Sequence, residues 1–414
     1  MARKMKDSGI EWIGEIPEGW EVSKLKYLGR YVNGYPFKPD DWGDKGKPII
    51  RIQDLTGSND SPNYYDGDID AKYHIKNGDI LVSWAATLDA FIWNKGDGLL
   101  NQHIFKAIPQ EKKITSYFFF WMIKEAMQNM NNDNKHGIFM QHVTLDVFNN
   151  FSVPLPPLSE QKRIATYLFQ KISEADIMLD DTLSSITGYK KLKQAVITQA
   201  VTKGVRGERE MKDSGVEWIG EIPKEWKCQK LKYTIFPQNR PVFSTDEIIT
   251  CFRDGIVTLR KNRREDGFTV SFTEHGYQGV EIGDLVIHGM DAFAGAIGCS
   301  DSRGKTTPVV HVCTTTGNNR FFMFFLRHMA YSNIFMDFSN GIRIRSSDFR
   351  NFTKLGIFDV LVPPIAEQNE IADYLDAKCT EIDKLIAKKE QLVKELENYK
   401  KSLIYEVVTG KREV

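Results

Sequence analysis

The amino-acid sequence predicts an α+β fold: two mixed α/β domains joined by two long antiparallel helices that form a coiled coil, with a pseudo-two-fold internal repeat. Three observations lead to this prediction. Two different motifs each occur twice, at a near-constant separation along the chain. The segments between them are rich in glycine, aromatic and β-branched residues, as in mixed domains. After the second motif, apolar residues recur at spacings of three, four and seven, which is typical of coiled-coil helices.

The first repeated motif opens each half of the chain. Met5–Trp20 reads MKDSGIEWIGEIPEGW, and Met211–Trp226 reads MKDSGVEWIGEIPKEW. The tetrapeptide KLKY follows each copy, at 24–27 and at 230–233. Ordered matches of this length do not arise by chance, so the chain consists of two half-chains, about 1–207 and 208–414, with the same order of parts.

The middles of the two half-chains share little sequence. Short β-branched segments bounded by turn residues predict strands at Ile49–Ile52, Asp79–Val82 and Asp284–Ile287. Asn77-Gly78-Asp79 and Ile282-Gly283-Asp284 are interpreted as equivalent turns, each entering a strand. Aromatic-rich runs over Ile114–Met130 and Arg320–Tyr331 predict short core helices rather than cofactor-binding segments. Each middle is therefore expected to be a mixed α/β domain.

The second repeated motif marks the start of a helix. Leu155–Leu168 reads LPPLSEQKRIATYL, and Val362–Leu375 reads VPPIAEQNEIADYL. Proline suits the residues just before and at a helix start but cannot continue a helix. The acidic Glu160 and Glu367 then complement the positive N-terminal end of each helix.

The helices that follow are expected to be long. They are predicted over Ser159–Val201 and Ala366–Val408, each ~65 Å long at a rise of 1.5 Å per residue. Gly188 weakens the first pattern and is a candidate for a bend. The predicted seam residues of the first helix are Ile164, Leu168, Ile172, Ala175, Leu179, Leu183 and Ile186. Those of the second helix are Ile371, Leu375, Ile382, Leu385, Leu392, Leu396, Tyr399 and Leu403.

An antiparallel arrangement of the helices has a consequence for the chain ends. The motif at Met211 directly follows the first helix, whereas the motif at Met5 has no helix before it in sequence. A two-fold arrangement would supply the end of the second helix in that place, so Val414 is expected to lie close to Met1. The packing of Trp12 and Trp20 is then expected to mirror that of Trp218 and Trp226.

Composition excludes several classes of protein. Hydrophobic residues make up 41% and charged residues 27% of the 414 residues, which is typical of a globular protein. The chain has no apolar run long enough to cross a membrane, and its N-terminus lacks the apolar core of a signal peptide. The five cysteines form no CxxC pair, which favours reduced thiols and a cytoplasmic location. The zero net charge excludes a uniformly basic surface but allows local basic faces.

The sequence contains no convincing catalytic or metal-binding set. GCSDSRGKT at 298–306 resembles a phosphate-binding loop but has five residues between its glycines instead of four, so a surface turn is favoured. No glycine-rich turn suits a dinucleotide or S-adenosylmethionine. His103, His142, His288 and His311 lack the spacing of metal ligands. No cofactor and no metal are expected.

Cationic and amide side chains gather in the middles. Arginine, lysine, asparagine and glutamine are the residues that read base edges, and arginine and lysine also neutralise phosphates. The candidate DNA-binding residues are Arg51, Gln53, Gln102, His103, Lys135, Gln141, Arg253, Arg260, Lys261, Arg263, Arg264, Arg343 and Arg345. Arg343 and Arg345 would share one face of a strand. For any one of these residues a solvated surface role is the better interpretation, but for the set within the repeated architecture DNA binding is favoured.

The two repeated motifs and the terminal YEVVTGKREV resemble the specificity subunit of type I restriction-modification enzymes. ILVSWAATLDAFIWNKGDGLLNQHIF, at 80–105, resembles a target recognition domain of that family. The resemblance implies four parts: a target recognition domain with its repeat motif over 1–154, a long helix over 155–207, a second recognition domain over 208–361 and a second helix over 362–414. It covers nearly the whole chain, although the middle of the second half matches little beyond Gly283-Asp284.

The resemblance also implies a function. Each recognition domain would bind one half of a split sequence in double-stranded DNA, and the helices would hold the domains apart. The helices and nearby repeats would dock two methyltransferase subunits, which carry S-adenosylmethionine, and restriction subunits would join that core. Candidate partner-binding residues are Glu160, Gln161, Glu367 and Gln368. Catalysis is expected in the partners and not in this chain.

Two other functions compete with this one. A stand-alone DNA methyltransferase or nuclease would need a cofactor loop and a catalytic motif that the sequence does not show, and it would bind S-adenosylmethionine by itself. A coiled-coil scaffold without a role on nucleic acid would show no salt-dependent binding to duplex DNA.

Overall fold

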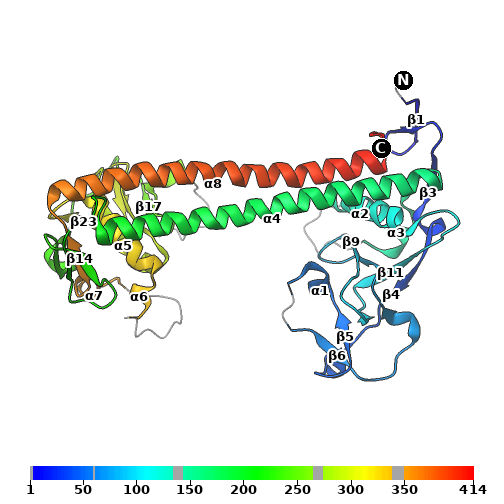
Figure 1. Cartoon of the computed structure of the whole chain (residues 1–414), viewed down its shortest axis with the longest axis horizontal. Coiled ribbons are helices and arrows are strands. Elements are labelled where there is room, and N and C mark those ends of the chain that lie inside the picture. The colour runs from blue at the N-terminus through cyan, green and yellow to red at the C-terminus, as the bar shows by residue number, and fades with distance from the viewer. Residues whose placement is uncertain (1–2, 59–60, 134–142, 264–273, 338–348) are drawn as a thin grey trace. The chain divides into compact units, whose positions relative to one another are not determined.

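The computed structural model describes residues 3–58, 61–133, 143–263, 274–337 and 349–414 (Figure 1). The chain divides into two units, which we describe one at a time. Unit 1 comprises Met1–Thr182 together with Leu392–Val414, and unit 2 comprises Leu183–Gln391. Each unit therefore contains segments of both long helices.

The two long helices are α4 (Leu158–Lys203) and α8 (Ile365–Val408), which confirms the predicted pair. Helix α4 continues through Gly188 without interruption. Within unit 2 the two helices run antiparallel, because Lys190 pairs with Glu390 while Lys193, one turn later, pairs with Asp383.

Most of the predicted seam is buried, including Ile164, Leu168, Ile371 and Leu375. Three predicted seam residues are wrong: Leu183, Leu385 and Tyr399 are 46%, 36% and 42% exposed. Beside Leu183 and Leu385, the neighbouring Thr182 and Ile386 are buried instead. At these two positions the spacing of apolar residues placed the inward face one residue away from where it lies.

The middle of unit 1 is built from two four-stranded sheets. The first has the order β4-β11-β8-β9 and is antiparallel throughout. Its strands are β4 (Gly29–Asn33), β8 (Ile80–Ser83), β9 (Asp89–Ile92) and β11 (Ile104–Pro109). The second sheet has the order β6-β5-β10-β7. Its strands are β5 (Lys47–Ile50), β6 (Asn63–Tyr65), β7 (His74–Ile75) and β10 (Gly98–Leu100).

Unit 2 repeats this topology with unlike residues. Its antiparallel sheet has the order β16-β23-β20-β21. Those strands are β16 (Ile235–Pro237), β20 (Leu285–His288), β21 (Ile297–Cys299) and β23 (Val310–Thr315). Two antiparallel pairs replace the second sheet: β17 (Ile249–Cys251) with β18 (Val257–Leu259), and β19 (Gln278–Val280) with β22 (Gly304–Thr306). A parallel bridge between Ile248 and Lys305 joins them, as the parallel pair β5–β10 does in unit 1.

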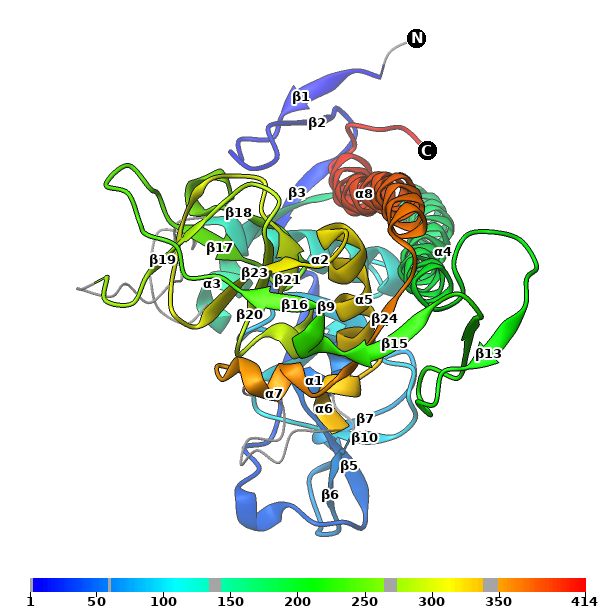
Figure 2. The ribbon, with the colours of Figure 1, turned by 90° about the vertical axis from the view of Figure 1, so that its left-hand side faces the viewer.

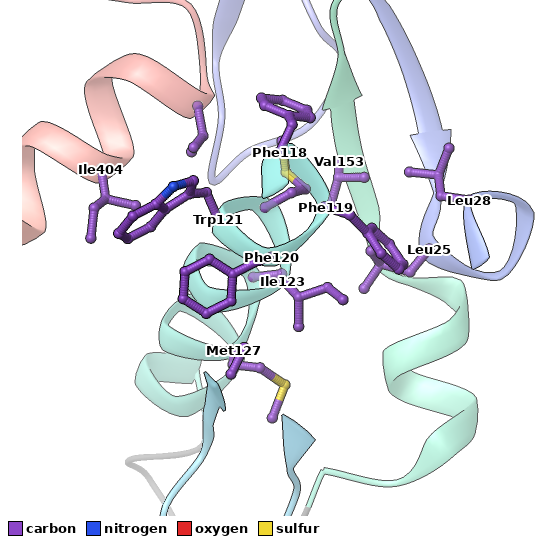
Figure 3. Close-up of a cluster of buried hydrophobic side chains, with 14 of the residues drawn as sticks. Leu25, Leu28, Phe118, Phe119, Phe120, Trp121, Ile123, Met127, Val153 and Ile404 are labelled. Atoms are coloured by element: carbon purple, nitrogen blue, oxygen red, sulfur yellow. The ribbon is translucent and has the colours of Figure 1, made fainter. Parts of the chain in front are cut away.

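One helix covers each antiparallel sheet, and both helices lie where short core helices were predicted. In unit 1 it is α2 (Ser116–Asp133), and Figure 3 shows its Phe119, Trp121 and Met127 in a buried cluster with Ile404 of α8. In unit 2 it is α5 (Asn319–Tyr331), which packs between the sheet and the long helices (Figure 2). Thirteen-residue α5 buries nine side chains because its aromatic residues face both layers.

The strands predicted at Asp79–Val82 and Asp284–Ile287 are confirmed as β8 and β20. The turns that enter them are equivalent. Gly78 and Gly283 adopt φ of 91° and 84°, a region that favours glycine. The carboxylates of Asp79 and Asp284 each accept a hydrogen bond from the backbone N–H three residues earlier, at 3.0 and 2.7 Å.

The strand predicted at Ile49–Ile52 is wrong beyond Ile50. The short helix α1 (Ile52–Thr56) starts there, because the Asp54 carboxylate accepts a hydrogen bond from the Arg51 N–H at 2.8 Å and caps the helix start. Gly57, with φ of 74°, ends it.

Small elements surround the helix starts. The repeat motifs form hairpins of β1 (Met5–Asp7) with β2 (Glu15–Pro17) and of β13 (Met211–Asp213) with β14 (Glu221–Pro223). The strands just before the helices, β12 (Ser152–Leu155) and β24 (Asp359–Val362), pair with β3 (Glu21–Lys24) and β15 (Lys227–Lys230). The remaining helices are α3 (Leu145–Asn150), α6 (Ile334–Asp337), α7 (Phe352–Gly356) and the 3-10 turns η1 (Leu25–Tyr27), η2 (Pro39–Asp41), η3 (Ala71–Tyr73), η5 (Leu231–Tyr233), η6 (Arg260–Asn262) and η7 (Ala292–Ala294).

The end of α8 lies in unit 1, beside the N-terminal motif. Tyr405 donates to the Trp12 carbonyl at 3.2 Å, and Lys411 donates to the Ile13 carbonyl at 2.7 Å. Val414 packs against the core of unit 1. The expected placement of the helix end is therefore confirmed, whereas Met1 lies outside the described residues.

The tryptophan prediction holds for one pair only. Trp20 and Trp226 are both buried, and each donates its indole N–H to a helix-start glutamate. Trp12 stacks on Phe151, but Trp218 packs against Phe325 and His328. The residues that Trp12 and Trp218 contact come from the unlike middles, so the packing of these two tryptophans differs.

Candidate nucleic-acid interface

Each antiparallel sheet has two ends with different surroundings. The start of β11 pairs with the end of β8, Ile104 with Ser83, and the start of β23 pairs with the end of β20, Val310 with His288. We call this end, with the loops that leave it, the loop edge. The opposite end of β11 leads toward the start of α4, and we call it the helix edge. The two edges lie about 16 Å apart at ~3.3 Å per residue.

In unit 2 the loop edge contains a pocket of about 730 Å³. Its walls come from the ends of β17 and β20, the residues after β18 and the turn between β22 and β23. Three of the predicted DNA-binding residues line it: Arg253, Arg260 and Arg263. These residues lie close together in sequence, between 253 and 263, and the fold places all three around the same pocket.

Carboxylates hold two of these arginines. Arg253 pairs with Asp291 at 2.9 Å, and 68% of its side chain is exposed. Arg263 makes two hydrogen bonds to Asp254, at 2.9 and 2.5 Å, and its guanidinium lies 4.4 Å from the centre of the Phe252 ring. Exposed pairs of this kind contribute little to stability, about 0–1 kcal/mol, so a ligand can displace the carboxylate at small cost.

The other members of the set are close by. Arg260 donates its Nε–H to Thr250 at 3.2 Å, and Lys261 pairs with Glu247 at 2.5 Å. His288 closes one wall of the pocket. Burial lowers the pKa of His288, and its Nδ1 accepts from the backbone N–H of Met290 and Asp291 at 3.3 and 3.1 Å. At neutral pH His288 is therefore an uncharged residue beside the arginines of this pocket.

In unit 1 the predicted residues lie at the corresponding places. Gln102 and His103 are exposed in the turn between β10 and β11. Arg51 follows β5, and its guanidinium lies 5.2 Å from the centre of the Trp42 ring. Gln53 is exposed on α1. The ring of His103 meets Trp84 edge-on, with centroids 5.4 Å apart.

Five predicted residues lie outside the described part of the chain: Lys135, Gln141, Arg264, Arg343 and Arg345. The residues that resume the chain after two of these gaps return to the loop edge. Val143 donates its N–H to the Trp84 carbonyl at 3.1 Å, and Phe349 donates to Gly289 at 2.7 Å. Trp84 follows β8, and Gly289 follows β20.

The candidate partner-binding side chains contact their own chain. Glu160 accepts from Trp20 at 2.9 Å and pairs with Arg3 at 2.6 Å. Gln161 is buried, accepting from the Thr115 N–H at 2.8 Å and donating to the Lys113 carbonyl at 2.9 Å. These contacts fix the start of α4 to the helix edge of unit 1.

The second copy does the same at the start of α8. Glu367 accepts from Trp226 at 3.0 Å and from Arg209 at 2.5 Å, and only 1% of its side chain is exposed. Gln368 accepts from the Asn318 N–H at 2.9 Å. Glu-Gln after Pro-Pro is thus a connector between helix and domain in both units.

Among the described residues, no group of three or more His, Cys, Asp or Glu could hold a metal ion. The loop at 298–306 runs between strands β21 and β22 and not from a strand into a helix, and Lys305 in it pairs with Glu274. In the same part of the chain no helix is long and apolar enough to cross a membrane.

Sequence reasoning missed the acidic members of the unit 2 pocket. Asp254 and Asp291 lie in it beside the arginines, together with Thr306 and Thr307. Asp254 lies six to ten residues before the members of the basic run at 260–264, which is a weak signal of pairing. Nothing in the sequence connects Asp291 to that run.

Comparison with known proteins gives consistent results. Residues 17–186 match the model of the type I restriction modification DNA specificity domain. The EcoBI specificity subunit of Escherichia coli is 26% identical over 272 residues, 64% of this chain and 57% of that protein, so the match spans less than two thirds of that relative. The type I restriction enzyme MjaX specificity subunit of Methanocaldococcus jannaschii is 28% identical over 430 residues, covering 96% of this chain and 95% of that protein.

A solved structure has the same fold. It comes from a description of complex assembly and conformational transition of the type I restriction-modification system. The TM-score is 0.68 at 15% sequence identity, and the match covers 96% of this chain and 99% of that one.

Proposed function

We propose that this chain, which belongs to the family of type I restriction enzyme specificity subunits, is the non-catalytic subunit that recognises DNA sequence in such a complex. Each unit would read one half of a bipartite target in double-stranded DNA. The observation that carries the proposal is the duplicated topology with unlike loop edges. Two DNA-binding units with the same strand order but different exposed surfaces suit a target whose halves differ in sequence.

The side chains at the loop edges fit this task. An arginine can donate two hydrogen bonds to guanine O6 and N7, and a glutamine can pair with adenine. Asp254 and Asp291 could accept from the amino group of cytosine. The remaining cations would neutralise phosphates, which positions the protein without reading sequence. Arg51, Gln102, Arg253, Arg260 and Arg263 are the residues for which we propose these roles first.

Catalysis would reside in partners. We propose that two methyltransferase subunits dock on this chain and that restriction subunits join them. The methyltransferase would supply S-adenosylmethionine, and this chain would need no cofactor. The complex would act where the DNA is, in the cytoplasm.

The direct test exchanges the first recognition segment. Residues Trp20–Phe151 are replaced by the equivalent segment of a relative, and methylated positions are then mapped in a genome that carries the hybrid with its methyltransferase. One half of the target should change while the other remains. A change in both halves, or in neither, would reject two separate readers.

A second test addresses the basic set of unit 2. Alanine variants of Arg253, Arg260, Lys261 and Arg263 are compared in the assembled complex for affinity to duplex DNA at several salt concentrations. Loss of one phosphate contact should reduce the slope of log affinity against log salt by roughly 1. Loss of sequence preference at constant slope would assign that residue to base reading, and four unaffected variants would reject the site.

A further inference from the structure

A partner that binds in two copies needs the same surface in both units. The loop edges differ, and the repeated Glu-Gln pairs are used inside the chain. The candidate surface must therefore be exposed, repeated and rich in residues that contribute strongly to binding. Tyr27 and Tyr233, the last residues of the two KLKY segments, meet all three conditions, with 55% and 60% of their surface exposed.

The two tyrosines have matching surroundings. The Lys26 ammonium lies 5.2 Å from the centre of the Tyr27 ring, and that of Lys232 lies 4.9 Å from the centre of the Tyr233 ring. The neighbouring short helices differ in sequence but each adds an exposed aliphatic residue. Val147 on α3 is 54% exposed, and Ile357 at the end of α7 is 55% exposed.

Both tyrosines lie at the helix edge, away from the predicted DNA contacts. Gly29, two residues after Tyr27, pairs with Pro109 at the far end of β11 from His103. In unit 2, Ile235 pairs with Thr315 at the far end of β23 from the arginine pocket. DNA bound at a loop edge would therefore lie about 16 Å from these tyrosines at ~3.3 Å per residue of strand.

We infer that Tyr27 with Lys26, and Tyr233 with Lys232, are two equivalent docking patches, each for one methyltransferase subunit. The inference rests on the proposed function and names the surface that serves it. Large exposed aromatic side chains are the residues that most often anchor protein interfaces. The adjacent lysines favour a partner surface with an apolar centre and an acidic rim.

The test measures how many methyltransferase subunits the full chain binds. Native mass spectrometry and titration are carried out with the methyltransferase subunit of the same restriction system. The wild-type chain should bind two copies. Tyr27→Ala or Tyr233→Ala should weaken one binding step by about tenfold or more, and the double variant should weaken both. Lys26→Glu and Lys232→Glu should act in the same direction, and thermal unfolding checks that each variant is folded.

Phe243→Ala is the matched control, since Phe243 is 54% exposed in unit 2 and has no repeated counterpart. It should leave both binding steps unchanged. If the tyrosine variants bind two copies as tightly as the wild type, the patches are wrong. The patches would also be wrong if the tyrosine variants bound the methyltransferase subunit normally but bound DNA more weakly, with a smaller slope of log affinity against log salt. That result would indicate that these patches contact phosphates. If the wild-type chain binds no methyltransferase subunit, the proposed function itself fails.

Discussion

Units 1 and 2 share a strand order but few of the residues that form it. The antiparallel sheets correspond strand for strand, and in both the glutamate after Pro-Pro accepts from a buried tryptophan. The loop edges, by contrast, carry Trp84 against His103 in one unit and an arginine pocket in the other. We call the strand order and the contacts at the helix starts that both units share the frame. The comparison indicates that the helix edge holds this frame together, whereas the residues of the loop edge are free to vary.

The largest effect is expected where the frame is closed. Trp20→Ala and Trp226→Ala each remove a fully buried side chain that bridges the repeat motif and a helix start. Each should destabilise its own unit by about 3–5 kcal/mol. Hydrogen exchange resolved by peptide would measure the two units separately. A cost under about 1 kcal/mol in either unit would contradict the shared frame.

The stability of the two units should change with pH in opposite directions. In unit 1, burial raises the pKa of Glu125 on α2 to about 7, although its hydrogen bond from Asn129 opposes the rise. In unit 2, burial lowers the pKa of His328 on α5 to about 4. His328 forms a hydrogen bond with Thr198 of α4 at 3.0 Å. The repeat places Tyr405 of α8 at the position equivalent to Thr198. Burial raises the pKa of Tyr405, and the nearby Glu125 carboxylate raises it further.

The signs follow from the protonated forms. Burial favours the neutral acid form of Glu125 in the folded protein. Its contribution to the stability of unit 1 is therefore complete below its pKa in the unfolded chain and is lost as pH rises through about 7. Burial favours the neutral form of His328 in the folded protein. Its contribution to the stability of unit 2 is therefore complete above its pKa in the unfolded chain and is lost as pH falls toward about 4. Each effect should reach at most about 3 kcal/mol. Hydrogen exchange in α2 and α5 between pH 5 and 8 would measure it, with Glu125→Gln and His328→Asn as the variants that should remove it.

A smaller difference is expected between the two helix-start glutamates. Glu367 is 1% exposed and its partner Arg209 is 15% exposed, whereas Glu160 and Arg3 are 12% and 27% exposed. Glu367→Gln should therefore cost more than Glu160→Gln, about 1–3 kcal/mol against less than about 1 kcal/mol, because a buried cation loses its partner. Thermal unfolding of the two variants compares them directly, and equal costs would show that burial of the pair is unimportant.

The smallest effect on stability is expected at the loop edge. Lys261 and Glu247 are 53% and 52% exposed, and Lys261→Ala should change the free energy of unfolding by less than about 0.5 kcal/mol. The same variant should still weaken DNA binding if Lys261 contacts a phosphate. A large loss of stability would mean that the arginine pocket is part of the frame after all.

Much of the frame could be predicted from the sequence. The repeats located both helix starts, and periodicity located α4 and α8, because long amphipathic runs carry a strong signal. Aromatic-rich runs located the shorter helices α2 and α5. Among the short strands of the unlike middles, β8 and β20 were predicted. The strand at Ile49 was extended wrongly to Ile52, because the capping role of Asp54 was not recognised. The shared strand order was also out of reach, since pairing between distant strands leaves no local pattern.

The candidate site could be predicted in composition but not in arrangement. Arg253, Arg260 and Arg263 form one basic cluster in the sequence, but the sequence does not show that they line a common pocket. The acidic partners Asp254 and Asp291 were missed because ion pairing depends on spatial neighbours. Glu160 and Glu367 were expected to face partners, but the sequence could not show that Trp20 and Trp226 already contact them.

The central claim is that the loop edges read DNA while the helix edges carry the frame and its partners. Hydroxyl-radical footprinting of the assembled complex, with and without its target duplex, tests this most directly. DNA should protect the segments 51–53, 102–103 and 253–263, and it should leave Tyr27 and Tyr233 unchanged. Protection of the two tyrosines by DNA, with the loop-edge segments still reactive, would contradict the account.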